Sequence, residues 1–126
     1  MPITVTAPRG VLTADGEREI LPRLTAALAD ATDATGDEAI VNTIGGTVQL
    51  LDRQHVYAGG RPTPLVLVEL KLPPVALSTR ERRARFITAA TEAVADLTED
   101  THEDRHTWVN ILHAQEGSWG IGGQAI

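Results

Sequence analysis

The chain uses one pattern twice, and this internal repeat restricts the fold more than any other feature. An extended apolar run, a helix start and a glycine pair occur in both halves, in the same order and at nearly the same spacing. The first half has PITVT from Pro2, Thr13 and Gly59-Gly60, and the second half has PLVLVEL from Pro64, Ser78 and Gly122-Gly123. A length of 126 residues is typical of one domain. The sequence therefore predicts a single domain, 1–126, of two pseudo-repeats at about 1–63 and 64–126.

Each repeat contains one long amphipathic helix. Apolar residues recur at helical spacing over about 14–30 and about 79–97, which places an apolar stripe on one side of each helix. Thr13 and Ser78 are the expected N-caps, because their hydroxyl groups can accept an unpaired backbone N–H. Ser78 and Glu81 have the spacing of a capping box.

A returning strand is expected after each helix, near 38–44 (EAIVNTI) and near 107–114 (TWVNILHA). A strand–helix–strand crossover is right-handed and makes its two strands parallel. Two such units predict an α+β (α/β) fold, with a four-stranded mixed sheet and two helices on one face. The run LVLVEL (65–70) is apolar at nearly every position, so both of its faces favour burial. We expect another copy of the subunit to cover the second face in a closed homo-oligomer.

Composition narrows the classes of function. The chain has no cysteine, which excludes disulfides, thiol catalysis and cysteine-ligated zinc. Its net charge of −6 argues against a nucleic-acid partner, and no apolar run approaches the roughly 20 residues that span a membrane. The start, MPITVTAPRG, has neither a basic nor an apolar signal region, so a cytoplasmic location is expected. We interpret the basic cluster as a solvated helix face; it comprises Arg80, Arg82, Arg83 and Arg85.

Pro2 is the residue that most suggests chemistry. Removal of the initiator methionine before a small residue would leave the nitrogen of Pro2 as a free secondary amine. An α-amine has a pKa of about 7.7–8.0 in model compounds, and burial in an apolar pocket lowers that pKa. A neutral amine at working pH is a general base. The alternative is that Pro2 only begins a strand, a common position for proline.

The end of the chain, EGSWGIGGQAI (116–126), adds to this pattern. With PITV at the start and the repeated β-α-β unit, it resembles the tautomerase superfamily, specifically the long members with two fused 4-oxalocrotonate tautomerase-like units. The hairpin of that family is matched by Gly117, Trp119, Gly120, Ile121, Gly122 and Gly123. The resemblance covers essentially the whole chain.

The resemblance implies stacked β-α-β units in trimers or hexamers, here a homotrimer, and chemistry without a cofactor or metal. It also implies that Pro2 carries a proton in keto–enol isomerisation of a small carboxylate or enol substrate such as a 2-oxo acid. Related dehalogenases, hydratases and decarboxylases use the same proline as an acid. Pro64 matches the start of the second unit, but its nitrogen is an amide and cannot be a base. The alternative is a catalytically silent oligomer that binds a small ligand or a protein.

The cations that would hold a substrate carboxylate depart from the family pattern. The family places arginines on the loop after the first strand, where Arg9 lies nearby, and on a later strand, where this chain has Trp108. Long members have arginines after the first strand of the second unit, where KLPPVALS offers only Lys71. Lysine binds a carboxylate as a point charge rather than as a fork. For both Lys71 and Arg9, a solvated surface position is the alternative.

Four further residues are candidates for substrate contact. Trp119 matches the hairpin aromatic that lines the pocket in the family, whereas Trp108 lies either in the pocket or in a core or interface. Tyr57 could supply a hydroxyl group to the site of a neighbouring subunit. Asn110, and Asn42 at the matching place in the first repeat, either polarise a carbonyl or bond to backbone. A pocket rich in tryptophan favours a bulky substrate or a weak carboxylate requirement.

Residues 102–106, HEDRH, match the H-E-x-x-H pattern of zinc hydrolases. On a helix, His102 and His106 would bind zinc with Glu103 as base. The stretch directly precedes the expected strand TWVNIL, however, which leaves little room for a helix, and no third ligand has suitable spacing. A charged surface turn is the better interpretation, and we expect His55 and His113 to be structural or surface residues.

Overall fold

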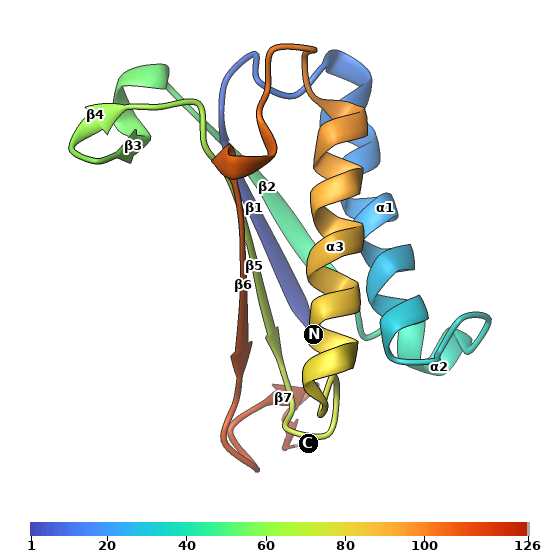
Figure 1. Cartoon of the computed structure of the whole chain (residues 1–126). Helices are drawn as coiled ribbons and strands as arrows, with labels where there is room; N and C mark the ends of the chain where they lie inside the picture. Colours follow the sequence, from blue (N-terminus) through green and yellow to red (C-terminus); the bar gives the residue numbers. More distant parts are fainter. Residues whose placement is uncertain (126) are drawn as a thin grey trace.

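The computed structural model describes residues 1–125 as two β-α-β units followed by short hairpins (Figure 1). The first unit and its hairpin contain β1 (Pro2–Pro8), α1 (Ala14–Ala31), α2 (Glu38–Val41), β2 (Gly45–Leu51), the 3-10 turn Arg53–His55, β3 (Tyr57–Ala58) and β4 (Arg61–Pro62). The second contains β5 (Val66–Leu72), α3 (Arg80–Leu97), the 3-10 turn Asp104–His106, β6 (Thr107–His113), β7 (Gly120–Ile121) and β8 (Gln124–Ala125).

The four long strands form one mixed sheet in the order β2-β1-β5-β6. β1 is parallel to β2, β5 is parallel to β6, and the two pairs meet where β1 runs antiparallel to β5. α1 and α3 pack side by side on one face of the sheet (Figure 1). The predicted four-stranded mixed sheet with two helices on one face is confirmed.

The core lies between this helix pair and the sheet. Alternate strand residues face the helices, and they include Ile3, Val5 and Ala7 of β1 and Val66, Val68 and Leu70 of β5. The helices contribute Ile20, Leu24, Leu28, Phe86, Ala90 and Val94. Complete burial of one large apolar side chain contributes about 1.5–3 kcal/mol, so this layer is the main source of stability.

The other face of the sheet, which we call the open face, is covered by no helix of residues 1–125 (Figure 1). Its side chains are mostly polar or exposed and include Thr4, Thr6, Glu69, Lys71, Trp108 and Asn110. Leu67 and Glu69 are half-buried, whereas Val66, Val68 and Leu70 are buried under the helices. The run LVLVEL therefore alternates in its environment. Within residues 1–125, no helix is both long enough and apolar enough to cross a bilayer.

The prediction of a strand near 38–44 is wrong. Residues Glu38–Val41 form the short helix α2, whose first turn is capped by Asp37, because the Asp37 carboxylate accepts a hydrogen bond from the backbone N–H of Ile40 at 3.3 Å. The strand begins only at Gly45. Asn42 is the C-cap of α2 and not a strand residue, so it does not occupy the place in the first repeat that Asn110 has in β6.

The helix starts are close to those expected. Thr13 is the N-cap of α1, and its hydroxyl oxygen accepts a hydrogen bond from Gly16 N–H at 2.8 Å. The cap of α3 is Thr79 rather than Ser78, and it accepts from Arg82 N–H at 3.2 Å. The expected capping box is therefore wrong, because the helix begins one residue later.

Candidate functional site

A cavity of about 360 Å³ surrounds the amino terminus, which is within the usual range of small-molecule sites. The end of α1, the short helix α2, the loop between β5 and α3, and the first turn of α3 form its wall. Figure 1 places the amino terminus and these segments toward one end of the sheet. The wall is largely aliphatic and includes Ile40, Val75, Ala76 and Leu77.

Met1 lines this cavity and is only 7% exposed. Its amino group donates a hydrogen bond to the carbonyl oxygen of Thr43 at 2.6 Å. Burial lowers the pKa of this amino group below its ordinary value, because a charged amine loses hydration there. The nitrogen of Pro2 is bonded to Met1, which lines the cavity, whereas Pro2 itself is exposed at the start of β1 and is not a lining residue.

Arg82 also lines this cavity. It lies in the first turn of α3 and pairs with the Asp33 carboxylate, which follows the end of α1, at 2.7 Å. The interpretation of the basic cluster as a solvated face therefore misses Arg82. The repeat itself indicates this position of Arg82. When α1 and α3 pack antiparallel, the start of α3 lies beside the end of α1.

Lys71 lies at the same end of the sheet as Pro2. In the register of β1 with β5, Ile3 is opposite Leu70, so Lys71 is the next residue beyond that pair. Its side chain projects on the open face, away from the buried Leu70 and Leu72, and its ammonium group is 3.3 Å from Glu69 Oε1. Lys71 does not line the cavity that holds Met1.

Three predicted contacts lie toward the opposite end of the sheet from Pro2. Arg9 follows the end of β1, about 20 Å along the strand, and pairs with Asp52 at 3.3 Å. Tyr57 lies in the β3–β4 hairpin and is 52% exposed. Trp108 is the second residue of β6, and its indole N–H donates to Arg105 O at 3.1 Å. A single chain does not bring these side chains to Pro2.

Two other predicted contacts are closer in the fold but remain outside the cavity. Asn110 is exposed on the open face, opposite Glu69 in the β5–β6 register. Trp119 is half-buried and precedes β7, and its hairpin lies near the end of β6 in Figure 1. Trp119 contributes to a hollow formed by its own hairpin and not to the cavity around Met1.

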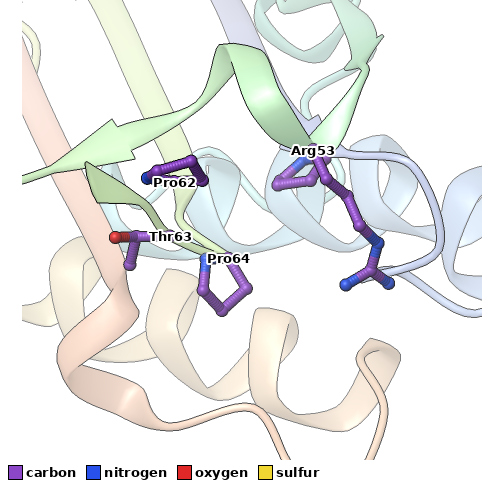
Figure 2. Close-up of a pocket in the computed structure, with 5 residues that line it drawn as sticks. Arg53, Pro62, Thr63 and Pro64 are labelled. Carbon is purple, nitrogen blue, oxygen red and sulfur yellow. The ribbon is translucent and has the colours of Figure 1, made fainter.

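A second cavity lies at the start of the second repeat. It has a volume of about 230 Å³ and is lined by Arg53, Pro62, Thr63 and Pro64, together with Pro8 (Figure 2). The nitrogen of Pro64 is an amide, and the only ionisable group in the described lining is the Arg53 guanidinium, which does not lose its proton in proteins. This cavity therefore offers no base, and the amino-terminal cavity is the better candidate.

The HEDRH segment forms a turn, as expected. Only Asp104–His106 has helical character, as a 3-10 turn. His102 Nε2 lies 2.8 Å from Thr107 Oγ1, and burial, with a smaller contribution from His106, lowers the pKa of His102. Within residues 1–125, no group of three potential ligands could hold a metal ion. His113 Nε2 is 2.9 Å from Ala76 O, which ties β6 to the β5–α3 loop.

Comparison with known proteins identifies the fold. No family model matches the sequence, and no curated protein matches it. A native fused 4-OT is 24% identical, with a TM-score of 0.81 over 99% of this chain and 95% of that one. A fused 4-OT that forms an asymmetric trimer is 22% identical, with a TM-score of 0.82 over 99% and 95% of the two chains. N1, a member of the cis-3-chloroacrylic acid dehalogenase family, is 16% identical, with a TM-score of 0.81 over 100% and 83%. This chain therefore has the tautomerase-like fold of the fused 4-OT proteins.

Proposed function

We propose that this protein is a tautomerase-like enzyme in which the nitrogen of Pro2, freed by removal of Met1, transfers a proton on a 2-oxo acid or its enol. The observation that carries the proposal is the amino terminus set into an aliphatic cavity of small-molecule size. Burial already lowers the pKa of the Met1 amine in this environment. Loss of hydration at the freed nitrogen of Pro2 would lower its pKa in the same direction and increase the neutral fraction that can act as a base.

The proton transfer is balanced within the substrate. The nitrogen of Pro2 accepts the proton of the enol hydroxyl group as the O–H bond breaks and the carbonyl forms. The resulting ammonium ion then delivers that proton to the carbon of the former double bond. The reverse sequence converts the keto form to the enol. No electron is gained or lost, so the isomerase reaction proceeds without a cofactor.

The surroundings of Pro2 support this role. Ile40, Val75 and Leu77 give the cavity an aliphatic wall. Leu77 is buried, whereas Ile40 and Val75 are exposed and offer apolar surface that a substrate can cover. Lys71 lies at the same end of the sheet and can attract a substrate carboxylate as a point charge. The cavity is therefore suited to a small acid whose apolar part packs against this aliphatic wall.

The proposed assembly is a homotrimer. Fused 4-OT structures of closely similar fold are trimers, and the open face of the sheet has no covering layer within the described part of the chain. In a closed trimer, a neighbouring subunit can bring side chains from the far end of its own sheet to this cavity. That arrangement would give Arg9, Tyr57 and Trp108 their proposed substrate contacts. Asn110 and Trp119, which lie outside the cavity of their own chain, would likewise reach the substrate from a neighbouring subunit.

The first test combines intact mass with a matched pair of proline variants. Mass spectrometry of the protein from its native host should show the loss of Met1. Pro2→Ala should reduce kcat/KM on phenylenolpyruvate or 2-hydroxymuconate by about 10²–10⁴, the usual contribution of a general base. Pro64→Ala is the control, because the Pro64 nitrogen is an amide in any form of the chain. Full activity of Pro2→Ala would refute the proposal.

The pH dependence gives a second test. The base must be unprotonated, so kcat/KM should rise with pH through the pKa of the Pro2 amine. Because burial lowers the pKa at this terminus, the midpoint should lie below the free-amine range of about 7.7–8.0. A midpoint above that range would contradict a base in an apolar cavity. A parallel screen of unsaturated halo-acids distinguishes isomerase from dehalogenase, hydratase or decarboxylase activity.

One observation favours a catalytically silent binding protein as the second candidate. Met1 is itself a buried part of the cavity wall, and its amine donates a hydrogen bond to Thr43 O. If Met1 is retained in the cell, Pro2 is acylated and cannot be a base. Retained methionine together with no turnover of any enol would therefore replace the enzyme with the binding protein.

A further inference from the structure

The amino-terminal cavity is lined by a cation from the basic cluster at the start of α3. Of the described residues that line it, Arg82 alone has a charged side chain. The other cations considered for the substrate carboxylate lie elsewhere: Lys71 is on the open face, and Arg9 is at the opposite end of β1. A carboxylate inside the cavity would therefore meet Arg82 first.

The present partner of Arg82 is suited to exchange. Arg82 Nη2 is 2.7 Å from Asp33 Oδ2, and both side chains are partly exposed, at 40% and 59%. Ion pairs with this exposure contribute little to stability. The guanidinium group has five N–H donors in a planar fork that can hold a carboxylate through two parallel hydrogen bonds. An incoming carboxylate can replace Asp33, or share the fork with it, without a large loss of folding stability.

We infer that Arg82 is the substrate-binding cation of this cavity and that Asp33 holds it in place until the substrate carboxylate displaces the Asp33 carboxylate. This inference rests on the proposed function of Pro2. It also names the substrate class, a monocarboxylic 2-oxo acid or enol with an alkyl or aryl substituent. None of the other described lining residues has a charged side chain. A second carboxylate there would therefore have no guanidinium or ammonium side chain to pair with.

A pair of variants on the same two helices tests this role. Arg82→Gln should raise KM for phenylenolpyruvate about ten- to a hundredfold, the range for loss of charge-assisted hydrogen bonds. kcat should change little, since the carboxylate interaction is made in the ground state and the transition state alike. Arg85→Gln is the matched control, because Arg85 pairs with Asp30 at 3.2 Å across α3 and α1 but does not line the cavity. Its KM should stay within about twofold of wild type.

Asp33→Asn should change KM in the opposite direction to Arg82→Gln. Removing the competing carboxylate should lower KM for the acid severalfold, an outcome that damage to the fold would not produce. The methyl ester of the same enol is the neutral probe, and its KM should be unchanged in Arg82→Gln. An equal rise in KM for acid and ester would make Arg82 a structural residue, and an unchanged KM for the acid would also overturn the inference.

Failure of the proposed function can be distinguished from failure of this inference. Benzoylformate is a 2-oxo acid without a proton on the adjacent carbon, so it can bind but cannot form an enol. Calorimetric titration of benzoylformate should show weaker binding to Arg82→Gln than to Arg85→Gln, even in a Pro2→Ala background. Equal binding to the two arginine variants refutes the role of Arg82, whereas full turnover by Pro2→Ala refutes only the proline chemistry.

Discussion

Gly46 offers a sharp test of how β2 is held beside the amino terminus. Gly46 lies opposite Ile3 in the parallel β1–β2 register. A Cβ atom added at Gly46 would lie 2.2 Å from the carbonyl oxygen of Ile3 and 3.1 Å from Leu21 Cδ2. A carbon normally approaches a carbonyl oxygen to about 3.3–3.6 Å, so Gly46→Ala requires a movement of about 1 Å. The obstructing atom is backbone, and no side-chain rotation can relieve the contact.

The cost of this movement follows from the packing around it. Ile3 is fully buried, and forcing extra volume into a packed core costs about 1–3 kcal/mol. We expect Gly46→Ala to lower the free energy of unfolding by about 2 kcal/mol and Tm by about 8 °C. Urea and thermal unfolding followed by circular dichroism measure both. Turnover should also fall, because Ile3 adjoins Pro2.

The neighbouring glycine is the control. Gly45 precedes Gly46 in the same strand, and a Cβ atom there would meet nothing within 4 Å in the chain. Gly45→Ala should therefore leave the free energy of unfolding within about 0.5 kcal/mol of wild type. Equal stability of the two alanine variants would show that the close approach of Gly46 to β1 does not constrain the protein, and the reasoning would be refuted.

Two further predictions concern the second repeat. Thr79→Ala should lower the free energy of unfolding by about 1 kcal/mol through loss of the α3 cap, whereas Ser78→Ala should have little effect; urea denaturation of both variants measures the difference, and equal losses would contradict the assignment of the cap. NMR titration should give a pKa for His102 below its ordinary value of about 6.5. The folded state favours neutral His102, so the contribution of His102 to stability is present above its unfolded pKa. That contribution is lost as the pH falls through the folded pKa. Urea unfolding of wild type and of His102→Gln between pH 7 and 5 should reveal this loss.

Local patterns in the sequence predict the long elements well. The first helix, expected over about 14–30, runs from Ala14 to Ala31, because its cap and its apolar spacing both lie within the segment. The short apolar run at 38–44 is different, since a run of this length does not distinguish a strand from a helix turn. There the Asp37 cap decides in favour of α2. The strand starts at two glycines, of which Gly46 allows the close approach to Ile3.

The residues of the candidate site also divide into those that local sequence predicts and those that only the tertiary structure places. Pro2 is recognisable because the chemistry of a terminal amine depends on its place in the chain. Arg82 is not, because its basic neighbours in the sequence indicate a solvated face, and only the antiparallel packing of α1 and α3 carries it to the cavity. Lys71 is predictable only in part. The repeat predicts that it lies at the same end of the sheet as Pro2, but the strand register decides which face of the sheet its side chain occupies.

The sequence alone determined the duplicated strand–helix–strand order, the extents of the two long helices and the position of Pro2, because these depend on spacing and on groups a few residues apart. Tertiary structure decided which side chains surround the amino terminus. Met1, Ile40 and Arg82 are far apart along the chain, and they share one cavity only because the sheet register and the helix pairing are fixed by burial of the whole core. Contacts of that kind depend on the sum of many packing interactions, which no local pattern in a single sequence contains.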